Sequence, residues 1–192
     1  MSNLNRLLLG LVVCLLCVTG ITESGLANEQ KEKQGQLEIV GVPAQAVAGT
    51  YYTKTDVFYA DVQDIEGAFV RITYDDLVII GRVVEWRRKD NYLKVTVDAS
   101  LEQKDMNIIA DQIEYFTEEE RLLAEGNLQV TTEDATVYAD RMVHLEKEEK
   151  TDFFANVAVH ITDGKLFGDH FVIYSAEDRM EFIGSFRGEF DR

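Results

Sequence analysis

The 192-residue chain is poor in cysteine, proline and basic residues. Both cysteines, Cys14 and Cys17, lie in an apolar run at residues 7–18, so the rest of the chain offers no disulfide, thiolate metal site or cysteine nucleophile. No proline follows Pro43. The formal net charge is −16, with 35 acidic and 19 basic residues. This balance argues against nucleic-acid binding, which depends on neutralising phosphates with Lys and Arg.

The first 27 residues have the features of a secretory signal peptide. Arg6 precedes the apolar run, and a small-residue site, Gly25-Leu26-Ala27, follows it. The run is about a dozen residues, shorter than the ~20 needed to cross a bilayer as a helix. We expect cleavage after Ala27 and a periplasmic mature protein; the alternatives are an uncleaved inner-membrane anchor and lipidation at Cys14, which lacks the usual small residue before it.

The remainder divides at about residue 50. Residues 28–50 are polar and then small and apolar, which indicates a tether or a first strand. From residue 51 to 192, short runs rich in Val, Ile, Tyr and Phe alternate with charged clusters and contain no proline. This texture is typical of strands and turns, and we expect one β domain over residues 51–192.

A 29-residue repeat is the strongest signal in the sequence. One landmark is an aspartate that follows Ala or Gly, and it recurs at Asp111, Asp140 and Asp169. The other is a small residue followed by Asn or Ser, and it recurs at Gly126, Ala155 and Gly184. Two looser copies precede these, around residues 66–70 and 78–82. Two landmarks that keep one period through three copies indicate a repeat architecture.

Within each repeat the large apolar residues alternate with others, as in Leu128-Gln129-Val130 and Val157-Ala158-Val159. A period of two with β-branched residues predicts strands that bury one face. Acidic clusters, such as residues 117–121 and 146–150, fall between the runs, where hairpin tips belong. Each repeat is therefore expected to form two strands of about 9–10 residues and two short turns.

Each repeat begins with the half-unit apolar-Ala/Gly-Asp-x-apolar-x-apolar, continues with an acidic turn and ends with Gly-Asn-apolar-x-apolar. This pattern resembles the repeat of the LptA/OstA family. The resemblance covers residues 66–188 and is sharpest over 108–188. It implies an all-β fold, an open, twisted antiparallel β-jellyroll built from ~29-residue two-strand repeats. It also implies lipopolysaccharide as ligand, a periplasmic transport role in outer-membrane biogenesis, and other Lpt-type jellyroll proteins and an outer-membrane barrel as partners.

The inward-facing positions of the repeats form apolar columns. We expect them to line a groove for acyl chains, with the lipid-binding residues Ile113, Leu128, Val130, Met142, Val157, Val159, Phe171, Phe182 and Phe186. Burial of an alkyl chain there would gain about 0.8 kcal/mol per CH₂. The columns equally fit the filled core of a sandwich, because stacked sheets need an apolar interior. The resemblance favours the groove.

The sequence also departs from the family. The strong negative charge does not favour a phosphorylated glycolipid headgroup, and the one basic cluster, Arg87-Arg88-Lys89, is either a headgroup contact or a solvated hairpin tip. The N-terminal third lacks crisp repeats, which leaves open a variant like the membrane-tethered LptC. An unprotected final strand would invite head-to-tail self-association. A non-catalytic structural protein that assembles edge to edge, as bactofilins do, is the alternative.

We expect neither catalysis nor a cofactor. The three histidines, His144, His160 and His170, form no metal-binding pattern, and His144 falls in an apolar column, as a structural histidine would. No nucleophile elbow, phosphate loop or dinucleotide fingerprint occurs. The repeated aspartates are interpreted as strand-entry or turn residues that bond local amides.

Overall fold

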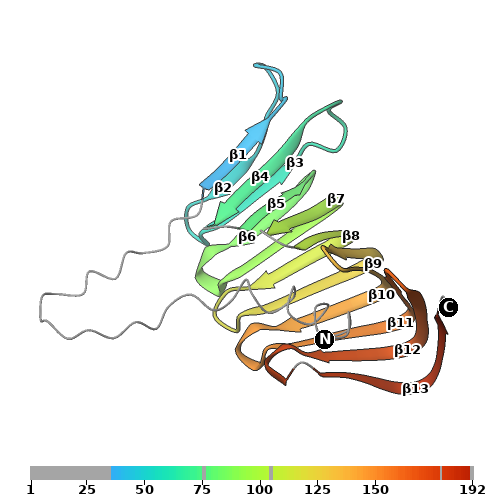
Figure 1. Ribbon diagram of the computed structural model, residues 1–192. Coiled ribbons are helices and arrows are strands. Elements are labelled where there is room, and N and C mark those ends of the chain that lie inside the picture. Colours follow the sequence, from blue (N-terminus) through green and yellow to red (C-terminus); the bar gives the residue numbers. More distant parts are fainter. Residues whose placement is uncertain (1–35, 75–76, 104–105, 178, 191–192) are drawn as a thin grey trace, which may run out of the picture.

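The computed structural model describes residues 36–74, 77–103, 106–177 and 179–190, which form one antiparallel sheet of thirteen strands (Figure 1). The predicted signal peptide lies outside the described residues. The strands are β1 Gln36–Val40, β2 Thr50–Tyr52, β3 Val57–Asp61, β4 Phe69–Tyr74, β5 Leu77–Gly81, β6 Val83–Arg87, β7 Tyr92–Gln103, β8 Met106–Phe116, β9 Arg121–Thr132, β10 Ala135–Leu145, β11 Lys150–Ile161, β12 Gly164–Tyr174 and β13 Arg179–Phe190.

The all-β antiparallel fold predicted from the repeat is therefore confirmed. From β7 onward the strands have 11 or 12 residues, slightly longer than expected. Short 3-10 turns, η1 Arg88–Asp90, η2 Glu146–Glu148 and η3 Ser175–Glu177, close three of the hairpins at the predicted acidic tips or at the basic cluster. Within the described ranges no helix is long and apolar enough to cross a membrane.

Strands β7 to β13 follow one another in a simple meander, and the sheet divides before β7. The C-terminal part of β7 pairs with β5, which leads to β4 and β1, whereas its N-terminal part pairs with β6, which leads to β3 and β2. We call these two sides the β5 half and the β6 half, and each long strand contributes to both. β5 and β6 are one long strand interrupted at Arg82. The loose early repeats therefore also contain a strand that contributes to both halves.

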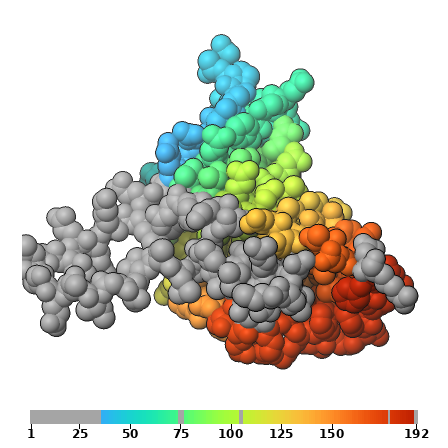
Figure 2. All heavy atoms as spheres, in the orientation of Figure 1, coloured from blue at the N-terminus to red at the C-terminus, as the bar shows by residue number. Residues whose placement is uncertain are grey.

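Every hairpin from β7 to β13 has a shift in register near its middle, for example between Thr96 and Ala99 of β7 and between Phe154 and Val157 of β11. A bulge bends its strand and increases the local twist. Because the bulges fall side by side, the sheet folds along one line, and the β5 half lies over the β6 half. Figure 2 shows the result, a molecule that is narrow at the N-terminal strands and broad at the C-terminal ones.

At this fold line, alternate strands carry residues with positive φ. They recur at the repeat spacing, at Val97–Asp98, Gly126–Asn127, Ala155–Asn156 and Gly184. This explains the small-residue landmark, since glycine adopts a left-handed backbone without steric cost, whereas other residues are disfavoured there by roughly 1–2 kcal/mol.

The aspartate landmark belongs to the same fold line, and our interpretation of it as a strand-entry or turn residue is wrong. Asp111 and Asp140 lie in the middle of β8 and β10, where each accepts a hydrogen bond from an asparagine side chain 16 residues later. The Asn127 amide nitrogen lies 3.0 Å from Asp111 Oδ2, and the Asn156 nitrogen lies 2.8 Å from Asp140 Oδ2. One repeat earlier, Arg82 and Asp98 occupy the equivalent positions with the donor and acceptor sides exchanged, and Arg82 Nη1 lies 4.0 Å from Asp98 Oδ2.

The inner faces of the two halves form the core. On the β5 half, residues that pair across successive strands form one buried row. The row begins with the pair Ile72 and Ile79 and ends with the pair Val159 and Leu166. On the β6 half the corresponding row, which we call the central row, comprises Val84, Val95, Ile113, Ala124, Met142, Phe153, Phe171 and Phe182. Apart from Phe182, its members are at most 1% exposed.

The left-handed backbone at the fold line predicts opposite changes in stability for substitutions at two equivalent positions. Ala155 has φ +59°, so Ala155→Gly should raise the free energy of unfolding by about 0.5–1 kcal/mol, the relief of strain less the entropy that glycine adds to the unfolded chain. Gly184 has φ +88°, and a Cβ there would meet nothing closer than Asp169 Oδ2 at 3.8 Å. Gly184→Ala should therefore destabilise through the backbone. Urea unfolding of both variants tests this, and a stabilising Gly184→Ala would contradict it.

Candidate functional site

The nine residues predicted to line a groove all lie on the inner faces of the sheet. Seven of them, on β8 to β12, are at most 2% exposed: Ile113, Leu128, Val130, Met142, Val157, Val159 and Phe171. Along these strands the protein's own side chains therefore fill the space between the two halves. The two halves of each long strand are joined at the fold line.

The other two predicted residues, Phe182 and Phe186 of β13, are 39% and 46% exposed. They differ from the first seven because β13 pairs with β12 and with no other strand of the described residues. Phe190, further along β13, is 64% exposed. The apolar interior is thus continuous from β7 to β13 and open to solvent at β13.

The aromatic rings at this open end contact one another. The Phe171 ring is perpendicular to that of Phe182, with centroids 4.7 Å apart, and the Phe182 and Phe186 centroids are 4.2 Å apart. Phe171 also lies over Gly168, where a Cβ would come within 2.6 Å of its ring. The small residue before the repeated aspartate therefore makes room for a large ring in this repeat.

The central row has its largest side chains at this end. The sequence of residues from β6 to β13 is Val, Val, Ile, Ala, Met, Phe, Phe, Phe. Because protein interiors are close-packed, larger side chains fill a wider gap between the halves. Phenylalanine rings thus fill the β12 and β13 end of the interior, which we call the wide end, and the valines of β6 and β7 lie at the opposite, narrow end.

His144 is a titratable residue of this interior. His144 of β10 is next to Leu122 of β9 and Thr151 of β11, and its Nδ1 is 2.9 Å from Thr151 Oγ1. Burial lowers the pKa of His144, because the charged imidazolium is poorly solvated there. The prediction that His144 is a structural histidine agrees with its contacts.

The predicted headgroup residues lie at the tip between β6 and β7 and outside the interior. Arg87 Nε is 2.7 Å from Glu85 Oε1, and Arg88 Nη1 is 3.9 Å from Asp56 Oδ1. Lys89 Nζ donates to the carbonyl of Lys54 at 3.3 Å. All three cations thus have polar partners within the chain, and nothing in their arrangement brings them to the groove residues.

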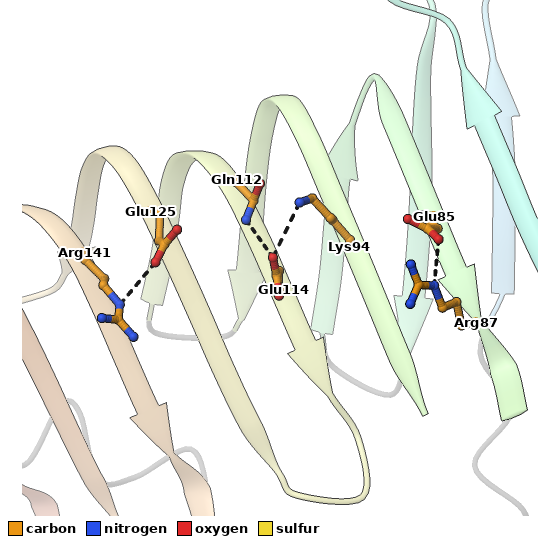
Figure 3. A network of polar contacts seen from close by, with 7 residues as sticks. All are labelled: Glu85, Arg87, Lys94, Gln112, Glu114, Glu125 and Arg141. Carbon is orange, nitrogen blue, oxygen red and sulfur yellow. Dashed lines mark hydrogen bonds and ion pairs between the residues drawn. The ribbon is translucent and has the colours of Figure 1, made fainter. Parts of the chain in front are cut away.

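Polar pairs also cross the outer face of the β6 half, a feature that sequence reasoning missed (Figure 3). Glu114 accepts a hydrogen bond from Gln112 and is 3.6 Å from Lys94 Nζ, and Arg141 Nε is 3.2 Å from Glu125. Opposite charges directly across antiparallel strands stabilise a pairing and specify its register. The outward positions of the repeat could have revealed these pairs once the strand register was known.

The remaining histidines are engaged in local contacts. His170 Nε2 is 2.9 Å from Asp152 Oδ1 on the outer face, and the His160 ring is in edge contact with Tyr138. No group of three or more His, Cys, Asp or Glu in the part of the chain that the structure describes is arranged to hold a metal ion.

Comparisons place this architecture in a known class. The fold is that of an LptA-like β-jellyroll. It is similar to the crystal structure of LptH, described as the LptA homologous periplasmic component of the conserved lipopolysaccharide transport device from Pseudomonas aeruginosa. The TM-score is 0.55 at 8% sequence identity, and the match covers 60% of this chain and 95% of that chain. No family model and no curated protein matches the sequence. At this identity the likeness establishes the fold.

The burial of His144 gives a pH-dependent stability. Its pKa is lower in the folded state than in the unfolded chain, where it is about 6.5. The unfolded state therefore binds more protons as the pH falls below that value, so this contribution is complete above about pH 6.5 and is lost on acidification. Urea unfolding between pH 7.5 and 5 should show a fall in stability that His144→Leu reduces and His160→Gln retains. An equal pH dependence in His144→Leu would contradict the assignment.

Proposed function

We propose that this protein binds lipid between the two halves of its sheet and serves as a periplasmic transport bridge in outer-membrane biogenesis, with lipopolysaccharide as the lipid. The observation that carries the proposal is the continuous apolar interior that opens to solvent at β13 through Phe182, Phe186 and Phe190. The similarity of the fold to a lipopolysaccharide-transport component supports the choice of lipid. Binding, rather than catalysis, is the activity that such an interior can perform.

The energetics favour an alkyl chain as the part of the lipid that is buried. Each CH₂ removed from water contributes about 0.8 kcal/mol, so several methylenes can offset the loss of packing between the halves when they separate. The central row provides the apolar surface, and Met142 within it has a flexible side chain that can repack around a ligand. The fold line holds the halves together on one side while the opposite side opens.

The edges of the sheet supply a means of assembly. Among the described strands, β13 pairs with β12, β1 with β4 and β2 with β3, so each has an edge without a described partner. Such edges recruit strands from other chains. We propose that β13 of one molecule joins the N-terminal edges of the next or of another Lpt-type jellyroll, and that an outer-membrane barrel ends the series. A role like that of LptC fits the same geometry.

The basic tip residues Arg87, Arg88 and Lys89 are proposed to contact a lipid headgroup only where that group extends beyond the β6 half. The surrounding acidic charge, with a formal net charge of −16, makes this contact weak. The periplasmic location rests on the signal peptide predicted from residues 1–27.

A second function is favoured by a specific observation, the complete packing of the interior from β8 to β12. A structural protein that assembles edge to edge needs a filled core and free edges and no ligand. The exposed rings of β13 would then lie against the neighbouring molecule in the assembly.

Native mass spectrometry of protein purified from a lipopolysaccharide-producing host should detect bound lipid. Phe186→Asp should abolish this lipid, because a carboxylate on the inner face of β13 is costly beside an alkyl chain. Ile183→Asp is the matched control, since Ile183 is 47% exposed on the outer face of the same strand. Lipid that is lost equally in both variants, or absent from the unmodified protein, would contradict the proposal.

Static light scattering over a range of protein concentrations tests whether the free sheet edges pair between molecules. The proposal predicts a mass that increases with concentration beyond a dimer, because head-to-tail pairing leaves a free edge on every assembly. A strict monomer at the highest concentration would contradict self-association.

A further inference from the structure

Three observations at the wide end of the interior point to a specific role for the phenylalanines there. Exposure falls from 46% at Phe186 and 39% at Phe182 to 1% at Phe171, one strand inward. The three rings form one contacting group, with the Phe171 and Phe186 centroids 6.2 Å apart. Beyond Phe171, the neighbours along the central row, Phe153 and Met142, are each 1% exposed.

We infer that Phe171, Phe182 and Phe186 form a movable aromatic plug, and that an alkyl chain enters or leaves the interior at β13 by displacing it. The inference rests on the proposed function and adds the place and the order of entry. Phe171 is the innermost ring of the plug, and its displacement connects solvent with the apolar space between the halves.

The ring of Phe171 has backbone on one side and two partly exposed rings on the other. The absence of a Cβ at Gly168 leaves the ring against a flat stretch of backbone on one side. On the other side Phe182 and Phe186 are each more than one-third exposed, so they can turn outward without crossing packed core. The Phe190 and Phe186 rings pack on Gly188, where a Cβ would come within 2.8 Å and 3.4 Å of them.

The narrow end is a less suitable entrance. The central row there has the short side chains Val84 and Val95, at 0% and 1% exposure, and the nearby rings of Phe58 and Trp86 pack against the core. Widening this end requires the halves to separate along their length, whereas at β12 and β13 rotation of aromatic side chains provides the opening.

Tryptophan fluorescence can report on each end separately. Trp86 of β6 is the single tryptophan of the chain, and a second position can be labelled by moving the indole. Trp86 pairs with Leu93 of β7 and is two residues along β6 from Val84, the member of the central row at the narrow end. In the double variant Trp86→Phe, Phe182→Trp, the indole instead lies in the plug. Dibromostearate, a fatty acid that quenches indole fluorescence on contact, should strongly quench the double variant and leave most of the Trp86 fluorescence of the unmodified protein. Quenching of Trp86 first or alone would overturn the inference.

Stopped-flow binding of the same fatty acid tests the movement of the plug. Phe171→Leu should accelerate association by roughly threefold, the factor that corresponds to the loss of one aromatic pair. Phe182→Leu should act in the same direction, and it removes a ring that is already partly exposed, so the core stays intact. The control is Phe154→Leu, on the outer face of β11, where the ring stacks on His170 and cannot touch the entrance.

The outcomes separate the two claims. Binding with equal rates in all three leucine variants and equal quenching at both ends would overturn the plug and leave the lipid-binding function standing. A fatty acid that quenches neither indole, together with no lipid in native mass spectra, would overturn both.

Discussion

The fold depends on the bend that each long strand makes near its middle. An antiparallel sheet of strands with 11 or 12 residues has an apolar face that a flat sheet would leave exposed, and no helix among the described residues covers it. The bulges solve this problem within the sheet itself, since adjacent bends place one half of every strand over the other half. The left-handed residues and the bonds from Asn127 to Asp111 and from Asn156 to Asp140 hold the bend in successive repeats.

This bend also explains why the interior could bind a ligand. A sandwich formed by folding one sheet has the covalent connection of its two layers on one side, along the fold line. The packing from β8 to β12 shows that the layers close fully on their own side chains. The exposed rings at β13 show where closure ends, because among the described strands β13 pairs with β12 alone. The apolar interior and its fold line thus follow from one repeated feature of the backbone.

Much of the architecture could be predicted from the sequence because the 29-residue period and the alternation of apolar residues are local patterns. They identified inward positions such as Ile113 and Val159 correctly as interior, but periodicity cannot distinguish a core residue from a groove residue. That distinction depends on the distance between the two halves. The gradation of the central row from valine to phenylalanine was visible only after the register aligned those residues.

The role of the aspartates was predicted wrongly for a related reason. Asp111 and Asn127 are 16 residues apart, and only the pairing of β8 with β9 brings them together, so a local turn appeared to be the simpler interpretation. The division of the sheet before β7 was also missed, because the early strands are short and their repeats are interrupted by loops at residues 41–49 and 62–68. In each case the deciding information is a contact between strands.

The central claim is that lipid occupies the space between the two halves, and in-cell photocrosslinking tests it most directly. A photoreactive phenylalanine analogue is placed at Phe186 on the inner face of β13 or at Ile183 on its outer face, and a lipopolysaccharide-producing host is irradiated. We predict a lipid adduct at the inner position and none at the outer one. Adducts at neither position, or adducts solely with protein at the inner position, would contradict the claim and favour a structural assembly.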